Sequence, residues 1–151
     1  MLNEYIKAHK ESISCISVSH DNEYVFSGGY DCYLKQWSVS EHVCVENYQE
    51  IHDDFISGLV VTLDNKEIWA SGGDGCLKIY DTKTYRCLKK FGKIHQKIIC
   101  GIEMSLDGKF VFTGCEDGSF KKWSVEKREM VMDYGKIHEN DHLFKSFCIM
   151  K

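Results

Sequence analysis

The chain has 151 residues and a formal net charge of −4, with 43% hydrophobic and 13% aromatic residues. This composition is that of a globular domain and excludes a disordered chain, while 19 basic residues scattered among 23 acidic ones disfavour a nucleic-acid-binding surface. No stretch approaches the roughly 18 apolar residues of a membrane span, and the amino terminus lacks a basic segment followed by an apolar one. We therefore expect neither a membrane protein nor an exported one.

The eight cysteines contain no C-x-x-C pair, which is a common spacing of zinc ligands. Most of them lie within apolar runs. A free cysteine behaves as a small buried hydrophobic residue, so we predict reduced core thiols rather than disulfides or a metal site. Reduced thiols indicate a reducing compartment, and we expect a cytoplasmic protein, with the nucleus as the alternative.

A fixed period organises the chain, because His9, His52, His95 and His138 follow one another at intervals of 43 residues. Within each unit, short runs of β-branched and aromatic residues are separated by turn sequences, without a helical stripe of apolar residues. This pattern predicts four strands in each unit. The predicted strands span residues 12–19, 23–28, 32–38 and 43–49, then 55–63, 67–72, 76–81 and 86–91, then 98–105, 109–114, 119–125 and 129–134.

Other residues recur at the period of the histidines. Counting 22 residues on from the first three histidines gives Asp31, Asp74 and Asp117. Counting 28 residues on gives Trp37, Tyr80 and Trp123. Between these positions we assign Ser27, Ser71 and Thr113 to one shared place, as hydroxyl residues that precede flexible turn residues.

These units resemble the WD40 repeat family, which has a His before the first strand of a unit, a Ser or Thr at the end of the second, an Asp in the next turn and Trp-Asp at the end of the third. The resemblance covers about residues 5–150. It implies an all-β fold, a partial WD40-type β-propeller of three four-stranded antiparallel blades forming a single domain over residues 1–151. The blades are expected at about residues 9–49, 52–91 and 95–134, with the last strand of a preceding blade in residues 1–8 and the first strand of a further blade in residues 138–151.

The units depart from the family pattern at two places. The Gly of the family's Gly-His pair is missing, since the residues before the histidines are Ala8, Ile51, Ile94 and Ile137. The Trp-Asp pair is replaced by Trp37-Ser38, Tyr80-Asp81 and Trp123-Ser124. The blades are therefore divergent members of the pattern.

Each unit contains the residue types of a hydrolase triad, but three equivalent sets at a fixed period do not form one reactive cleft. We expect no catalytic residue and no enzymatic activity. The resemblance implies instead a structural hydrogen-bond network in each blade. Its members would be His9, Ser27, Asp31 and Trp37, then His52, Ser71, Asp74 and Tyr80, then His95, Thr113, Asp117 and Trp123. Because Tyr80 offers a phenol where the other units offer an indole, we predict that the second network is the weakest.

No cofactor or metal is expected. His138 and His142 have the spacing of metal ligands on a helix, but they lie in a predicted loop that enters a strand. The paired glycines before the periodic Asp are better explained by tight turns than by phosphate binding.

Loops at the rim of a propeller carry its function on a rigid scaffold. By similarity to WD40 domains, the residues three positions after the periodic His and just before the periodic Asp point toward the upper face. The partner-binding candidates among them are Tyr30, Phe55, Ile98 and Glu116, with packing between blades as the alternative role of the apolar ones. Lys35, Lys78 and Lys121 also recur, either as a ring of cations for an acidic ligand or as stems that cover neighbouring side chains.

These features predict a WD40-repeat protein–protein interaction scaffold that mediates assembly of a multiprotein complex. The alternative is a substrate- or modified-peptide-recognition subunit of a ubiquitin-ligase or chromatin complex. The expected partners are other proteins or peptides, not nucleic acid or membranes. WD40 rings usually hold more than three blades, and an open arc would expose two apolar blade faces. We therefore expect the chain to be part of a longer chain, with an obligate oligomer or a subunit completed by another protein as the alternatives.

Overall fold

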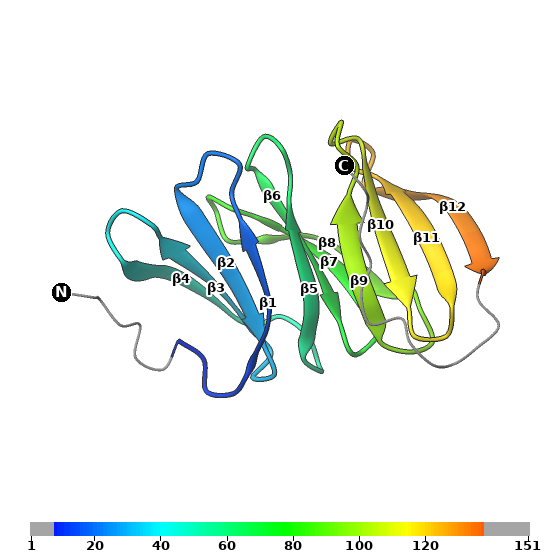
Figure 1. The fold of residues 1–151 in the computed structure, drawn as a ribbon, viewed down its shortest axis with the longest axis horizontal. Coiled ribbons are helices and arrows are strands. Elements are labelled where there is room, and N and C mark those ends of the chain that lie inside the picture. Colours follow the sequence, from blue (N-terminus) through cyan, green and yellow to red (C-terminus); the bar gives the residue numbers. More distant parts are fainter. Residues whose placement is uncertain (1–7, 138–151) are drawn as a thin grey trace.

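A computed structural model of the protein describes residues 8–137, which form twelve strands in three separate sheets (Figure 1). The first sheet contains β1 (Ile13–Val18), β2 (Tyr24–Gly29), β3 (Tyr33–Ser38) and β4 (Val43–Glu50). The second contains β5 (Ile56–Val61), β6 (Glu67–Gly72), β7 (Cys76–Asp81) and β8 (Cys87–Lys93). The third contains β9 (Ile99–Met104), β10 (Phe110–Cys115), β11 (Ser119–Ser124) and β12 (Glu129–Lys136). Each sheet is an antiparallel meander in chain order, as the repeat predicted, and the strand ends differ from the predicted ones by at most two residues.

The tight turns of the three sheets repeat the same backbone conformation. The turn between the first two strands has a left-handed residue at Asn22, Asn65 and Gly108, with φ between 59° and 68°. The turn between the next two has one at Cys32, Gly75 and Gly118, with φ between 64° and 83°. Asn and Gly adopt this conformation at low cost, so the turn residues of the sequence place the hairpins in the same register in every unit.

The sheets stand side by side, with β1 next to β5 and β5 next to β9 (Figure 1). Because side chains alternate along a strand, the middle sheet presents different residues to its two neighbours. In β6, Ile68 and Ala70 join the core shared with the first sheet, whereas Trp69 joins the core shared with the third. All three side chains are fully buried, which makes each sheet-to-sheet boundary a hydrophobic core.

A charged contact reinforces the boundary between the second and third sheets. Arg128 Nε and Nη2 donate to Glu67 Oε1 at 2.9 and 2.5 Å. Glu67 Oε2 accepts a hydrogen bond from Trp69 Nε1 at 3.1 Å, which holds the carboxylate against the core.

The outer faces of the first and third sheets are open in the described part of the chain. Ile13, Ile16 and Val18 are 49%, 66% and 46% exposed, although the residues one period later, Ile56, Leu59 and Val61, are buried. A hollow of about 520 Å³ lies on this face of the first sheet. On the outer side of the third sheet, the half-buried rings of Phe112 and Phe120 are stacked with centroids 5.6 Å apart.

The single strands predicted in residues 1–8 and 138–151 fall almost entirely outside the described residues, as do His138, His142 and Cys148. Within residues 8–137, the structure contains no helix long and apolar enough to cross a bilayer.

Candidate functional site

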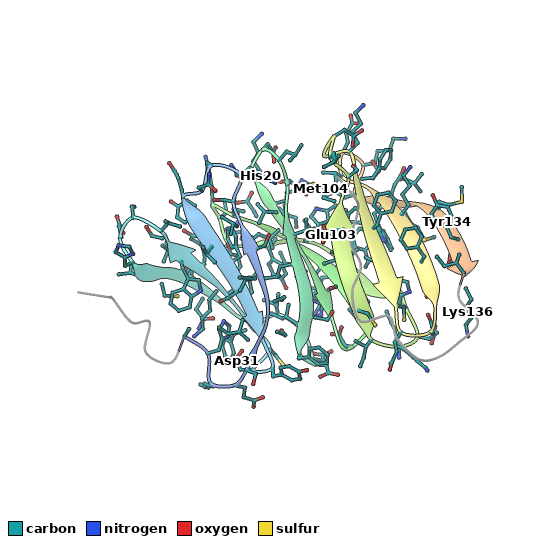
Figure 2. The ribbon with its side chains drawn as sticks, viewed as in Figure 1. His20, Asp31, Glu103, Met104, Tyr134 and Lys136 are labelled. Atoms are coloured by element: carbon teal, nitrogen blue, oxygen red, sulfur yellow. The ribbon has the colours of Figure 1, made fainter. Side chains whose placement is uncertain are left out.

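Two loops meet at the same edge of each sheet, and backbone hydrogen bonds join them. The amide groups of Tyr30, Gly73 and Glu116 donate to the carbonyl oxygens of Ser12, Phe55 and Ile98, at 2.9, 2.8 and 3.0 Å. We call this edge, formed by residues 8–12, 30–32, 51–55, 73–75, 94–98 and 116–118, the loop edge. Asp31 marks it in Figure 2, at the opposite end of the first sheet from His20.

In the first sheet, a continuous hydrogen-bond chain runs from the third strand to the loop edge. Trp37 Nε1 donates to Ser27 Oγ at 2.8 Å, and Ser27 Oγ lies 2.7 Å from His9 Nε2. His9 Nδ1 lies 2.8 Å from an Asp31 carboxylate oxygen, and Asp31 also accepts the backbone amide of Lys10 at 2.9 Å. A neutral imidazole fits these contacts, because Ser27 Oγ can donate to His9 Nε2 while His9 Nδ1–H donates to Asp31. Every polar group in this hydrogen-bond chain then has a partner.

The second sheet contains a shorter arrangement, and the assignment of Ser71 to it is wrong by one residue. His52 Nδ1 lies 3.0 Å from Asp74, but His52 Nε2 faces the backbone oxygen of Ala70 at 3.2 Å. Ala70, 18 residues after His52, occupies the position of Ser27 and Thr113 and has no hydroxyl group. Ser71 is bonded instead to Ser57 Oγ at 3.1 Å.

Tyr80 takes a core role in the second sheet. The residue is 7% exposed, and its ring meets the ring of Tyr48 edge-on at a centroid distance of 5.9 Å. Burial, with a contribution from neighbouring Cys87, raises the pKa of its phenol. A neutral His52 ring has one N–H, so it can donate to only one of its two acceptors, Asp74 and the Ala70 carbonyl group, at a time.

In the third sheet, a serine separates the periodic His from the periodic Asp. Trp123 Nε1 donates to Thr113 Oγ1 at 3.0 Å, and Thr113 Oγ1 lies 2.9 Å from His95 Nε2. His95 Nδ1 lies 2.7 Å from Ser119 Oγ rather than against Asp117. Burial alone would raise the pKa of Asp117, but the hydroxyl and amide groups of Ser119 outweigh it and lower the pKa to about 2. The expected direct contact between His95 and Asp117 is therefore replaced by a link through Ser119.

A single sequence position accounts for this difference. A Cβ atom at Gly29 would lie 2.9 Å from Asp31 Oδ1 and 3.0 Å from His9 Nδ1, and one at Gly72 would lie 2.5 Å from His52 Nδ1. The third sheet has Cys115 at the equivalent position, and its side chain is fully buried. Direct contact between His and Asp thus needs a glycine at this position. In the third sheet the side chain of Cys115 occupies this space, and Ser119 links His95 to Asp117 instead.

His95, Cys115 and Asp117 also bring potential metal-ligating atoms within 4.8 Å of one another. The spacing of these three residues did not predict this set. Both ring nitrogens of His95 are already paired with hydroxyl groups, and burial raises the pKa of the Cys115 thiol. Hydrogen bonding accounts for these contacts, and we assign no metal to them.

The periodic lysines support the loop edge through its backbone. Lys35 Nζ donates to the carbonyl oxygen of Ala8 at 2.6 Å, and Lys78 Nζ donates to that of Ile51 at 2.5 Å. In both sheets the acceptor is the residue just before the periodic His. Lys121 pairs instead with Asp133. These contacts favour local support over a ring of cations for an acidic ligand.

Tyr30 and Phe55, two partner-binding candidates from different sheets, form one aromatic surface at the loop edge. Their rings are stacked, with centroids 4.6 Å apart and an interplanar angle of 11°. Tyr30 is 51% exposed and Phe55 is half-buried. Ile98 is half-buried and Glu116 exposed in the third sheet. The Tyr30–Phe55 pair thus packs across a sheet boundary and also leaves the Tyr30 ring exposed to solvent.

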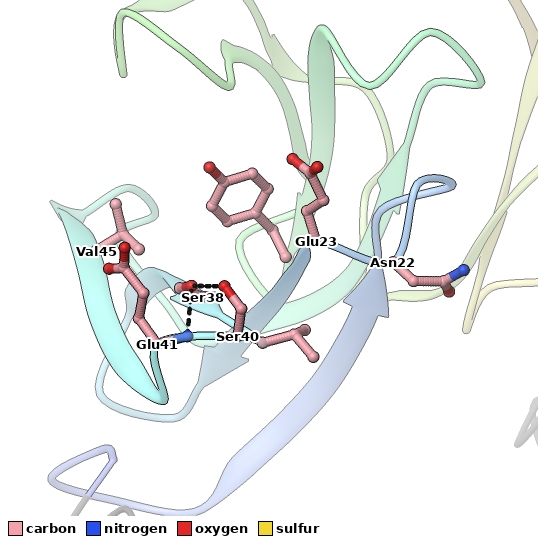
Figure 3. A pocket seen from close by; sticks show the side chains of 8 residues that line it. Asn22, Glu23, Ser38, Ser40, Glu41 and Val45 are labelled. Carbon is pink, nitrogen blue, oxygen red and sulfur yellow. Dashed lines mark hydrogen bonds between the residues drawn. The ribbon is translucent and has the colours of Figure 1, made fainter.

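The hollow drawn in Figure 3 lies away from the loop edge, where the turns after β1 and β3 approach each other. Its volume is about 530 Å³, and Ser38 Oγ accepts the amide of Glu41 there at 3.1 Å. The hydroxyl groups of Ser38 and Ser40 are 3.4 Å apart. These bonds belong to the turn itself, so the hollow contains no arrangement typical of a reactive site.

We expect His95 to make stability depend on pH. Burial, assisted by the nearby charge of Lys121, lowers its pKa from 6.5 to about 4. Between these values the unfolded chain binds a proton that the folded chain does not, so stability is full above about pH 6.5 and decreases as the pH falls toward 4. Urea unfolding at several pH values should show this slope, and His95→Gln should reduce it. A similarly destabilised core variant, Val111→Ala, should retain the slope; an unchanged slope in His95→Gln would contradict the assignment.

The three sheets are four-stranded antiparallel meanders that pack face to face, and their first strands lie next to one another. This arrangement defines the blades of a β-propeller. The chain belongs to the WD40 family. The family model described as "WD domain, G-beta repeat" matches residues 2–38 and 85–124. The stretch between them includes most of the second blade, which has Ala70 and Tyr80 in place of the hydroxyl residue and the tryptophan.

Solved structures share this fold. The structure described as "Structure of U3-55K" superposes with a TM-score of 0.80 at 20% sequence identity, covering 85% of this chain and 40% of that one. The structure described as "Crystal structure of RRP9 WD40 repeats" gives a TM-score of 0.77 at 21% identity, covering 83% and 39%. A comparison with curated protein sequences gives no match. The chain thus spans about two fifths of each of these two solved structures.

Proposed function

We propose that the protein is a non-enzymatic scaffold that binds other proteins through its loop edge. WD40 domains typically serve as protein-interaction scaffolds, and membership of this family supports the proposed class of function. The observation that carries the proposal is the exposed Tyr30 ring stacked on half-buried Phe55, because aromatic residues on a rigid support are typical anchors of protein interfaces.

The hydrogen-bond chains support a structural role for the His, Ser and Asp residues. The same linkage recurs in the first and third blades, and its polar atoms are engaged with one another rather than directed at a shared cleft. This arrangement favours a scaffold over a hydrolase. We place the protein in the cytoplasm or nucleus on its thiols alone, since the described free cysteines include Cys15, Cys44, Cys76, Cys87, Cys100 and Cys115.

A second candidate function is recognition of a peptide within a ubiquitin-ligase or chromatin complex. The aromatic pair favours it, since a small exposed ring surface suits a single side chain of a partner. The two candidates use the same surface and differ in the partner.

Partner capture tests this proposal. Tagged wild-type protein, Tyr30→Ser and Phe55→Ser would be incubated with cell extract, and the bound proteins quantified by mass spectrometry. We expect both variants to lose at least about four fifths of specifically bound partner, as interface hot spots do. Tyr85→Ser removes an exposed tyrosine remote from the loop edge and should capture as wild type does. Undiminished capture by folded Tyr30→Ser and Phe55→Ser would refute the assignment.

A further inference from the structure

The backbone of the second blade fixes the aromatic pair in place. A Cβ atom at Gly73 would lie 2.6 Å from Phe55 Cε1 and 2.9 Å from Asp54 Oδ2, so the Phe55 ring and the Asp54 carboxylate both lie directly over this glycine. Asp54 Oδ1 accepts the backbone amide of Phe55 at 2.8 Å, which sets the carboxylate beside the ring. Gly73, Phe55 and Tyr30 therefore form three layers in order.

The outermost layer is Tyr30, which is 51% exposed while Phe55 is stacked against its ring. Its backbone is tied to Ser12 at 2.9 Å, so the ring is carried by a braced loop. The pair is thus ordered before any partner arrives, which reduces the entropy cost of binding.

The exposed charged residues of the loop edge are mostly acidic, and Asp54 among them lies beside the Phe55 ring. The exposed acidic residues of the loop edge are Glu11, Asp53, Asp54 and Glu116. The exposed basic residues of the loop edge are Lys10 and Lys97. Lys10 lies over the ring of Tyr33, with Nζ 5.5 Å from the centroid, and thus already has an aromatic neighbour. The loop edge combines a flat aromatic face with an excess of carboxylates.

We propose that the Tyr30–Phe55 pair binds an arginine side chain on a basic segment of a partner protein, an inference that rests on the loop edge being the partner-binding surface. A guanidinium group is planar, stacks on aromatic rings and forms paired hydrogen bonds with carboxylates. An acidic or phosphorylated segment would be repelled by these carboxylates. A purely apolar side chain would gain the ring contact but would not complement the neighbouring charges.

Fluorescence anisotropy with a labelled peptide of alternating glycine and arginine tests this inference. The matched peptide has citrulline in place of arginine, which keeps the shape and removes the charge. We expect the arginine peptide to bind wild type at least about tenfold more tightly than the citrulline peptide. Tyr30→Ser, which leaves the net charge unchanged, should weaken binding at least about fivefold, whereas Tyr30→Phe should stay within about twofold because it keeps the ring. Asp54→Asn should weaken binding about threefold.

Two variants away from the loop edge control for nonspecific attraction to a negatively charged protein. Tyr85→Ser removes another exposed ring, and Glu126→Gln removes another exposed carboxylate. Both should bind as wild type does. Equal binding of the two peptides, no binding of the arginine peptide at about 1 mM, or equal affinities of Tyr30→Ser and Tyr85→Ser would each overturn the inference. The capture experiment decides the proposed function separately, since it depends on loss of partner in Tyr30→Ser and Phe55→Ser and not on this peptide.

Discussion

Gly72→Ala is expected to lower the free energy of unfolding by about 3 kcal/mol, which corresponds to a fall in Tm of roughly 10 °C for a domain of this size. The added Cβ atom would lie 2.5 Å from His52 Nδ1 and 2.8 Å from His52 Cγ. His52 is 3% exposed and cannot move outward freely, so its bond to Asp74 must break. Chemical denaturation followed by tryptophan fluorescence measures the loss.

Gly92→Ala is the matched control for this variant. Gly92 has a φ of 63°, and a Cβ atom there would meet nothing within 4 Å, so the cost is limited to backbone strain of about 1 kcal/mol. Equal losses in Gly72→Ala and Gly92→Ala would show that the His52–Asp74 contact does not require glycine.

The third blade suggests how the loss at Gly72 could be reduced. Ser119, which links His95 to Asp117, is equivalent to Cys76 in the second blade. Adding Cys76→Ser to Gly72→Ala should therefore recover part of the stability, because it supplies the hydroxyl group that the displaced His52 would need.

Asp31→Ala should lower the free energy of unfolding by about 2–3 kcal/mol. Its side chain is 4% exposed and accepts hydrogen bonds from His9, from the amide of Lys10 at 2.9 Å and from the amide of Tyr33 at 3.3 Å. Burial tends to raise the pKa of Asp31, but the hydrogen bonds from His9 and from these amides outweigh burial and lower the pKa. The folded protein therefore favours the ionised carboxylate of Asp31. Removing it leaves the buried His9 N–H without its acceptor.

Urea denaturation of two further variants shows how large the loss of stability in Asp31→Ala is by comparison. Asp117→Ala should cost less, because Ser119 stands between Asp117 and His95. Lys127→Ala, at an exposed position, should change stability by about 0.5 kcal/mol or less. A loss in Asp31→Ala no larger than that in Lys127→Ala would exclude a stabilising network in the first blade.

The fold could be predicted from the sequence because the signals that determine its strands and turns are short and recur in every unit. The histidine period and the turn residues Asn22, Asn65 and Gly108 place each strand to within two residues. Each of these signals depends on a few neighbouring residues and their preferred backbone angles.

The details of the networks required three-dimensional information. Ser71 was a plausible member because it is a hydroxyl residue before a glycine, although Ala70 is the residue at the repeat position. The effect of Cys115 was not predicted, since it depends on a distance between His95 and Asp117 that no spacing reveals. The Tyr30–Phe55 stack also depends on the angle between two blades, so the sequence could name both residues but not bring them together.

The position of the middle blade makes it harder to unfold locally than the blades on either side. Of the described blades, the one formed by β5–β8 has cores on both sides, and Ile68, Trp69 and Ala70 have no exposed surface. A blade at the end of an array can detach after losing one interface, whereas the middle blade must lose two. Within the described part of the chain, the middle blade is therefore expected to open last, and any molecule that covers the outer face of the first or third blade would slow the opening of that blade.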